Sequence, residues 1–128
     1  MLVDVANRKT KTMPANRLED WRSAVRAEAM LAATEAHPLT GPVALACEFY
    51  FARPPSHLRK DGGVKKGAPS IPRGDLDKLV RAVGDALTGV LYRDDVQVVA
   101  CRSWKGYTPE RSHAVICVGP VAEPEAMP

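Results

Sequence analysis

Four aspartates bracket one apolar segment of the chain and could together hold a hard cation. Asp75 and Asp77 precede the segment, and Asp94 and Asp95 follow it. Magnesium in proteins takes oxygen ligands, commonly one or two carboxylates with water and substrate phosphate. A helix between the two pairs would span roughly 20 Å at 1.5 Å per residue. The acids can therefore share an ion only if the chain folds back or a partner subunit supplies one pair.

Each pair of acids also has a purely structural interpretation. Aspartate is a common helix N-cap, and acids in the first turn suit the helix dipole. Asp94 and Asp95 follow Arg93 between two apolar runs, which is typical of a turn. Arg81 lies four residues from both Asp77 and Asp85, a spacing that favours surface ion pairs. The residues alone leave both interpretations open.

The segment between the acids has the spacing of an amphipathic helix. Its apolar side chains fall on one stripe, at Leu76, Leu79, Val80, Val83 and Leu87. Asp75 stands where an N-cap belongs, and Gly89 stands at the C-terminal exit. This pattern predicts a helix with acids at its start.

The rest of the chain predicts one more helix and three strands. A helix is expected from Asn16, its N-cap, to about His37, before Pro38. Alternating apolar residues predict strands at 43–52, 96–102 and 114–118, with a polar connection over 106–111. Leu2–Val5 is too short to be predicted as a strand. The expected fold is a single α+β domain, a mixed sheet flanked by two helices.

Basic residues gather in segments without periodicity. Residues 1–15 are expected to form a solvated basic arm, and the Pro- and Ala-rich residues 119–128 a frayed tail. Residues 53–73 are rich in Gly and Pro and predict a long mobile loop without regular elements, which in compact domains is often functional. The cations of this loop that could contact phosphates are Arg59, Lys60, Lys65, Lys66 and Arg73.

Composition limits the class of protein. The chain has 128 residues, 45% of them hydrophobic and 26% charged, which is ordinary for one folded domain. A net charge of +3 permits an anionic partner without requiring one. Cys47, Cys101 and Cys117 form no CxxC pair and are expected to be reduced core residues. No apolar run approaches the ~18 residues that span a membrane, so a cytoplasmic protein is expected.

The stretch from Gly74 to Lys105 resembles the signature of the RusA family of Holliday junction resolvases. In that signature Asp-x-Asp opens a helix, Asp-Ala-Leu lies near its end, and Asp-Asp-x-Gln-Val-Val enters a strand. The matching residues are Asp75, Leu76, Asp77, Leu79, Asp85, Ala86, Leu87, Asp94, Asp95, Gln97, Val98 and Val99. The order of the first helix, the 43–52 strand and the basic loop also agrees with the family, whose usual first strand is shortened or absent here.

The resemblance implies a homodimeric endonuclease, bacterial or phage-encoded, that resolves four-way DNA junctions by paired phosphodiester cleavage. It implies Mg²⁺ as the cofactor, with Mn²⁺ as a substitute. The implied metal-binding and catalytic carboxylates are Asp75, Asp77 and Asp95, with Asp94 beside them as a further metal ligand.

The resemblance also assigns roles to three basic residues. Arg81 stands where the family has a lysine that assists catalysis; it can clamp a phosphate but cannot donate a proton at neutral pH. Lys105 matches a family lysine after the strand, and Lys78 stands where the family often has Asn, which redistributes the positive charge; both are expected to contact DNA. Two other functions stay open: a non-catalytic branched-DNA-binding protein of the same fold, and a globular domain without a DNA partner, whose acids serve only as caps and turns.

Overall fold

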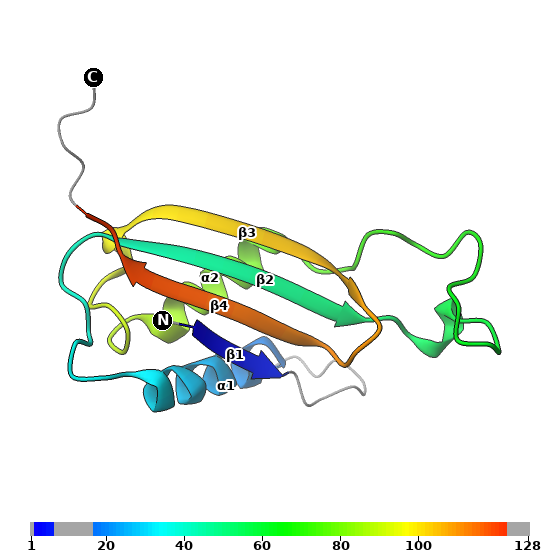
Figure 1. Cartoon of the computed structure of the whole chain (residues 1–128), viewed down its shortest axis with the longest axis horizontal. Coiled ribbons are helices and arrows are strands. Elements are labelled where there is room, and N and C mark those ends of the chain that lie inside the picture. Colours follow the sequence, from blue (N-terminus) through cyan, green and yellow to red (C-terminus); the bar gives the residue numbers. More distant parts are fainter. Residues whose placement is uncertain (1, 7–16, 123–128) are drawn as a thin grey trace, which may run out of the picture.

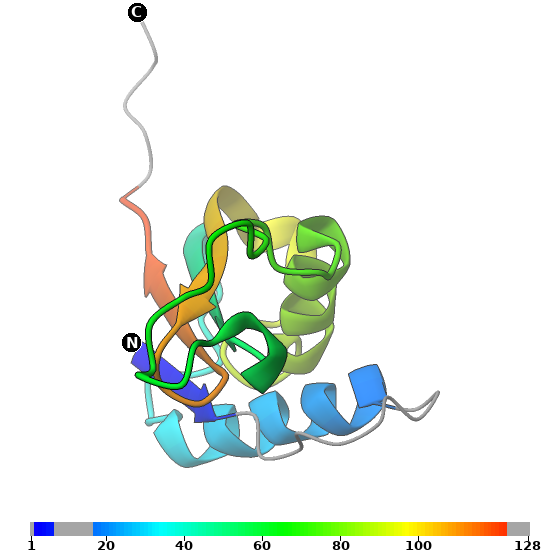
Figure 2. The ribbon, with the colours of Figure 1, turned by 90° about the vertical axis from the view of Figure 1, so that its right-hand side faces the viewer.

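The computed structural model describes residues 2–6 and 17–122 of the chain. Its strands form a four-stranded mixed sheet in the order β1-β4-β2-β3, and both helices cover the same face of it (Figures 1 and 2). The strands are β1 (Leu2–Ala6), β2 (Val43–Ala52), β3 (Val98–Thr108) and β4 (His113–Pro120). The helices are α1 (Arg17–Ala32) and α2 (Leu76–Leu87), with short 3-10 helices η1 (Pro55–His57) and η2 (Asp95–Gln97). The prediction of an α+β domain is confirmed.

β2 lies inside the sheet, parallel to β3 and antiparallel to β4. β4 pairs antiparallel with β1 on its other side. β3 therefore forms one edge of the sheet, and its residues from Val99 to Trp104 are exposed (Figure 1). The outer side of such an edge strand presents backbone N–H and C=O groups that a further strand can pair with.

The core fills the space between the sheet and the two helices. Alternate residues of β2 point into it, and Val43, Leu45, Cys47 and Phe49 are buried there. The helices add buried side chains at three- and four-residue spacing, namely Val25 and Ala29 of α1 and Val83, Ala86 and Leu87 of α2. The same periodicities that predicted these elements thus place their apolar faces against each other.

The N-terminal strand was missed by the sequence analysis. Leu2–Ala6 forms β1, which pairs with β4 from Leu2 opposite Cys117 to Ala6 opposite His113. Five residues are too few to predict a strand in isolation, but a neighbouring strand supplies the backbone partners. The predicted basic arm therefore begins inside the sheet, and its residues 7–15 lie outside the described part of the chain.

α1 is shorter than predicted. It ends at Ala32 instead of continuing to His37. The chain turns there, because the backbone N–H of Thr34 donates to Nδ1 of His37 at 3.0 Å. The predicted N-cap, Asn16, lies outside the described residues.

The basic loop has more regular structure than predicted. Within residues 53–73, η1 is followed by an antiparallel bridge between Leu58 and Val64. The backbone N–H of Arg59 donates to the carbonyl of Gly63 at 2.7 Å, which closes the turn. Glycine at such a turn allows the loop to fold on itself, so composition alone wrongly predicted a segment without regular elements.

The last two strands are longer than predicted. β3 starts at Val98 and continues to Thr108, because β2 supplies a partner as far as Ala52 opposite Thr108. The predicted connection over 106–111 therefore begins inside β3. β4 extends to Pro120, so the start of the predicted tail also belongs to the sheet.

The cysteines do not all lie in the core. Cys47 is buried, and burial, followed by the proximity of Cys101 and Cys117, raises the pKa of its thiol to about 12. Cys101 and Cys117 are exposed, so the prediction that they are core residues was wrong. All three are free thiols, as expected.

Candidate active site

Asp75 and Asp77 are both exposed at the start of α2. Asp75 is the N-cap, as predicted: its Oδ1 accepts a hydrogen bond from the backbone N–H of Asp77 at 3.0 Å. Its backbone carbonyl accepts from the N–H of Leu79, which begins the helical ladder. The second oxygen of Asp75 and the Asp77 carboxylate accept no hydrogen bond from the described residues. Capping thus uses one carboxylate oxygen and leaves the others for a ligand.

Lys105 holds the backbone just before this acidic pair. Its Nζ donates to the carbonyl oxygens of Pro72 at 2.9 Å and Gly74 at 2.6 Å. Gly74 has φ +114, a conformation that a residue with a side chain rarely adopts. Lys105 therefore ties the end of the basic loop to β3 and positions Asp75. Its predicted contact with DNA stays a prediction.

Asp94 and Asp95 lie in a separate turn at the start of η2. The Asp94 carboxylate accepts from the N–H of Val96 at 3.0 Å, and this bond, followed by one with Asp95, lowers the pKa of Asp94. Both acids are exposed. The predicted turn is confirmed, and its acids stay available to a ligand at the surface.

Gln97 builds the turn that carries Asp94 and Asp95. Its Oε1 accepts from the N–H groups of Arg93 (2.8 Å) and Asp94 (2.9 Å). Its Nε2 donates to the carbonyls of Leu39 (2.9 Å) and Gly41 (2.8 Å). The structural role of Gln97 could not be predicted from the sequence, although the residue matches the family signature, because its partners Leu39 and Gly41 are remote in sequence.

The two acidic pairs do not meet within one chain. α2 separates them by about 18 Å, since it has 12 residues rising 1.5 Å each. The strand β3 gives a similar separation. Lys105 contacts the backbone just before Asp75, and Val98 follows the turn that carries Asp95. Lys105 and Val98 lie about 23 Å apart along the strand, at 3.3 Å per residue. Among the described residues, no group of three or more His, Cys, Asp or Glu side chains could hold a metal ion. One chain therefore brings together Asp75 with Asp77, and Asp94 with Asp95, as two separate pairs.

The polar side of α2 carries exposed cations beside the first pair. Lys78 and Arg81 are both exposed, and neither forms an ion pair with another described residue. Asp85 pairs with Arg22 of α1 at 3.8 Å rather than with Arg81. Arg81 is therefore free to bind an anion, whereas Asp85 joins the two helices.

The cations of the basic loop lie at the surface. Lys60, Lys65, Lys66 and Arg73 are exposed, and Arg59 forms an ion pair with Asp61 at 3.2 Å. Exposed cations on a projecting loop suit contact with phosphates (Figure 1). Their contact with DNA stays a prediction.

A comparison with protein families identifies the chain. The family model described as endodeoxyribonuclease RusA matches residues 4–118. The chain belongs to the RusA family. This match confirms the resemblance seen in the sequence. Membership of the RusA family implies endodeoxyribonuclease activity on branched DNA. No curated protein relative was found by sequence. Neither described helix of this RusA protein is long and apolar enough to cross a membrane.

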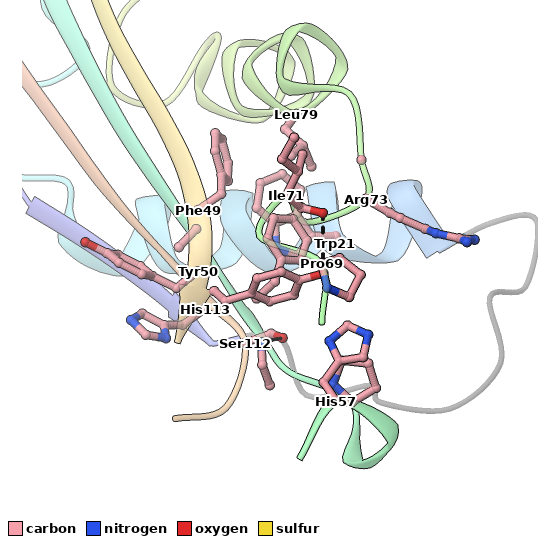
Figure 3. A pocket seen from close by; sticks show the side chains of 16 residues that line it. Trp21, Phe49, Tyr50, His57, Pro69, Ile71, Arg73, Leu79, Ser112 and His113 are labelled. Carbon is pink, nitrogen blue, oxygen red and sulfur yellow. Dashed lines mark hydrogen bonds between the residues drawn. The ribbon is translucent and has the colours of Figure 1, made fainter. Parts of the chain in front are cut away.

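A cavity of about 670 Å³ adjoins the acidic pair of this RusA protein, and sequence analysis did not foresee it. It lies between the end of the sheet, the basic loop and the start of α2 (Figure 3). Aromatic and apolar side chains from α1, β2, the basic loop, α2, β3 and β4 line it, including Trp21, Phe49, Ile71 and Tyr107. Of these lining residues, only those of β2 were recognisable in the sequence, from the alternation of apolar side chains. The other walls come from elements that are remote in the chain.

Proposed function

We propose that the protein is a magnesium-dependent, structure-selective endodeoxyribonuclease that resolves four-way DNA junctions by paired phosphodiester cleavage. The observation that carries this proposal is the exposed pair Asp75 and Asp77 at the start of α2, in a chain of the RusA family. Both carboxylates face solvent, where a DNA backbone can reach them. The neighbouring exposed cations suit the same ligand.

The donor atoms fit a hard divalent cation. Asp75 keeps one uncommitted oxygen and Asp77 keeps two, and magnesium commonly takes one or two protein carboxylates. When bound, Mg²⁺ or Mn²⁺ would activate a water and stabilise charge on the scissile phosphate. The helix N-terminus already attracts the phosphate group, because its dipole is positive there.

The chain's own cations would hold the DNA strand. Arg81 lies one turn along α2 from Asp77 and can bind a phosphate with two parallel hydrogen bonds. Lys78 lies beside it on the exposed surface. Since Arg81 keeps its proton at neutral pH, we assign it phosphate binding and transition-state charge stabilisation rather than proton transfer.

We also propose that the protein works as a two-fold dimer joined along β3. β3 is an edge strand, and it carries or adjoins exposed apolar side chains: Val96 (78% exposed), Val99 (61%) and Trp104 (50%). A long exposed edge with apolar residues is prone to pair with another strand. Antiparallel pairing of β3 with its own copy, centred near Cys101, would satisfy this edge in both subunits.

This dimer would complete the acidic site. In an antiparallel pair, the Val98 end of one strand lies opposite the Lys105 end of the other. Asp94 and Asp95 of the partner subunit would then approach Asp75 and Asp77. Two such sites, related by the two-fold axis, suit two symmetric cuts in a four-way junction.

Junction nicking tests the catalytic part of the proposal. Asp77→Asn should abolish Mg²⁺-dependent nicking of a synthetic four-way junction, because it removes a metal-binding carboxylate. Asp85→Asn is the matched control: it removes another acid of α2, one that pairs with Arg22, and should keep the nicking rate. Equal nicking by wild type and Asp77→Asn would end the catalytic proposal.

The replacement of the family lysine by Arg81 favours one second candidate, a non-catalytic branched-DNA-binding protein. Salt-dependent binding of the junction without any nicking would support it.

Cross-linking tests the dimer separately: a short bis-maleimide should join two subunits through Cys101, and Cys101→Ser should prevent this. Cys117→Ser, which removes the exposed thiol of β4, should leave the cross-link intact.

A further inference from the structure

The 670 Å³ cavity beside Asp75 has the dimensions and walls of a binding site for a flat apolar group. Its volume falls within the roughly 300–1,000 Å³ typical of small-ligand sites. Trp21 and Phe49 form a tilted aromatic pair with ring centroids 5.8 Å apart, and Tyr107 stands on β3. Ile71, which is 71% exposed, and Pro69 belong to the basic loop (Figure 3). These walls suit a planar ring.

The cavity is directly connected to the candidate active site. Gly74, the residue before Asp75, forms part of its lining, and so does Arg73. Lys105 fixes this wall through its hydrogen bonds to Pro72 and Gly74. A ligand in the cavity therefore lies within about one nucleotide of a phosphate at Asp75 and Asp77.

The charged side chains of the cavity lining suit a group that belongs to an anionic molecule. No described residue lining it is acidic, whereas Arg73 is cationic and His57 and His113 contribute imidazole rings. Nδ1 of His57 is buried and has no hydrogen-bond partner among the described residues. His57 thus brings to the lining a ring nitrogen that is not committed to another described residue.

Contacts with three neighbouring groups hold the Tyr107 ring in place. The Arg53 guanidinium lies over the ring, 4.1 Å from its centroid. His57 meets the ring edge-on at 5.7 Å, and the Tyr107 hydroxyl donates to the carbonyl of Ile71 at 3.4 Å. Arg53 therefore lies over the ring and His57 makes a T-shaped contact with it, so Tyr107 is a fixed aromatic wall of the cavity.

We propose that this cavity receives one unstacked nucleobase, from the nucleotide next to the phosphate at Asp75 and Asp77, and so contributes to the choice of cleavage site. The inference rests on the proposed function. Extruding a base costs least where pairing is already disturbed, as at a branch point. Stacking on an aromatic side chain offsets that cost.

Base deletion in the DNA tests the inference. Binding of four-way junctions is measured in Ca²⁺, with a series of single abasic sites around the branch point. For the wild type, one abasic position should weaken binding about tenfold, as expected for the loss of one base stack. In Tyr107→Leu that position should bind like its intact counterpart, whereas Tyr107→Phe, which keeps the ring, should retain the tenfold difference.

A second variant keeps the test decisive if Tyr107→Leu does not fold. Ile71→Trp places a large ring at an exposed position of the cavity wall and should likewise remove the dependence on that base. If each abasic site weakened binding to the same extent in wild type, Tyr107→Leu and Ile71→Trp, the inference would be overturned. The inference would also be overturned if these variants changed the dimerisation of the protein but not the dependence of junction binding on that base. The cavity would then hold a residue of the partner subunit instead of a base. Intact base dependence without nicking would overturn the nuclease proposal alone.

Discussion

Mixing two inactive variants should restore cleavage if each metal site is built from two subunits. One variant carries Asp75→Asn and Asp77→Asn, and the other carries Asp94→Asn and Asp95→Asn. Each homodimer lacks one acidic pair at both sites and should be inactive. In the heterodimer, one site lacks all four acids, whereas the other has all four.

The expected recovery follows from counting sites. Random exchange of two equimolar subunits makes half of the dimers mixed, and each mixed dimer has one complete site of two, so about a quarter of wild-type nicking should return. Because a mixed dimer can cut only once, its product should be a nicked junction rather than a resolved one. Gel analysis of a labelled junction separates these two products.

The distance between the acidic pairs makes the outcome decisive. The pairs lie on the order of 20 Å apart within one chain, far beyond the reach of a shared ion. If the pairs nevertheless met within one subunit, no dimer in the mixture would contain a complete site, and no activity would return. Full activity of either variant alone would show that one pair suffices and would refute the two-subunit site.

Three further outcomes are expected. Gln97→Ala should lower the free energy of unfolding in urea by about 2–4 kcal/mol, because it removes four hydrogen bonds worth roughly 1 kcal/mol each; an unchanged midpoint would contradict this. Lys65→Ala or Lys66→Ala should each reduce the salt slope of junction binding by about 0.9, and unchanged slopes would remove them from the DNA interface. Stability should fall as pH rises from 9.0 towards about 12, because Cys47 and Tyr92 keep their protons longer when folded than when unfolded. Cys47→Ala and Tyr92→Phe should flatten this fall in pH-dependent urea denaturation, and an equal fall in both variants would assign it to other groups.

The sequence predicted the features that depend on local chemistry. The start and end of α2 followed from Asp75 and Gly89, because an N-cap carboxylate and a glycine at φ +84 act on neighbouring backbone. The turn at Asp94 and Asp95 was predicted for the same reason. Family membership was also visible in the sequence, since the signature residues all lie within one stretch from Asp75 to Val99.

Features that depend on remote partners were not predictable. β1 exists because β4, more than a hundred residues later, offers it hydrogen-bond partners. The aromatic cavity draws its walls from α1, β2, the basic loop, α2, β3 and β4. No local pattern reports such contacts, because each segment carries only its own part.

The candidate site divides in the same way. Sequence alone indicated which acids are candidate metal ligands and which helix presents Asp75 and Asp77, because capping and periodicity are short-range. Only the tertiary structure decided that Lys105 fixes the backbone before Asp75 and that Gln97 holds the turn of Asp94 and Asp95. It also decided that α2 and β3 hold the two acidic pairs apart. The physical reason is that rigid helices and strands fix distances over tens of ångströms, whereas residue spacing along the chain does not.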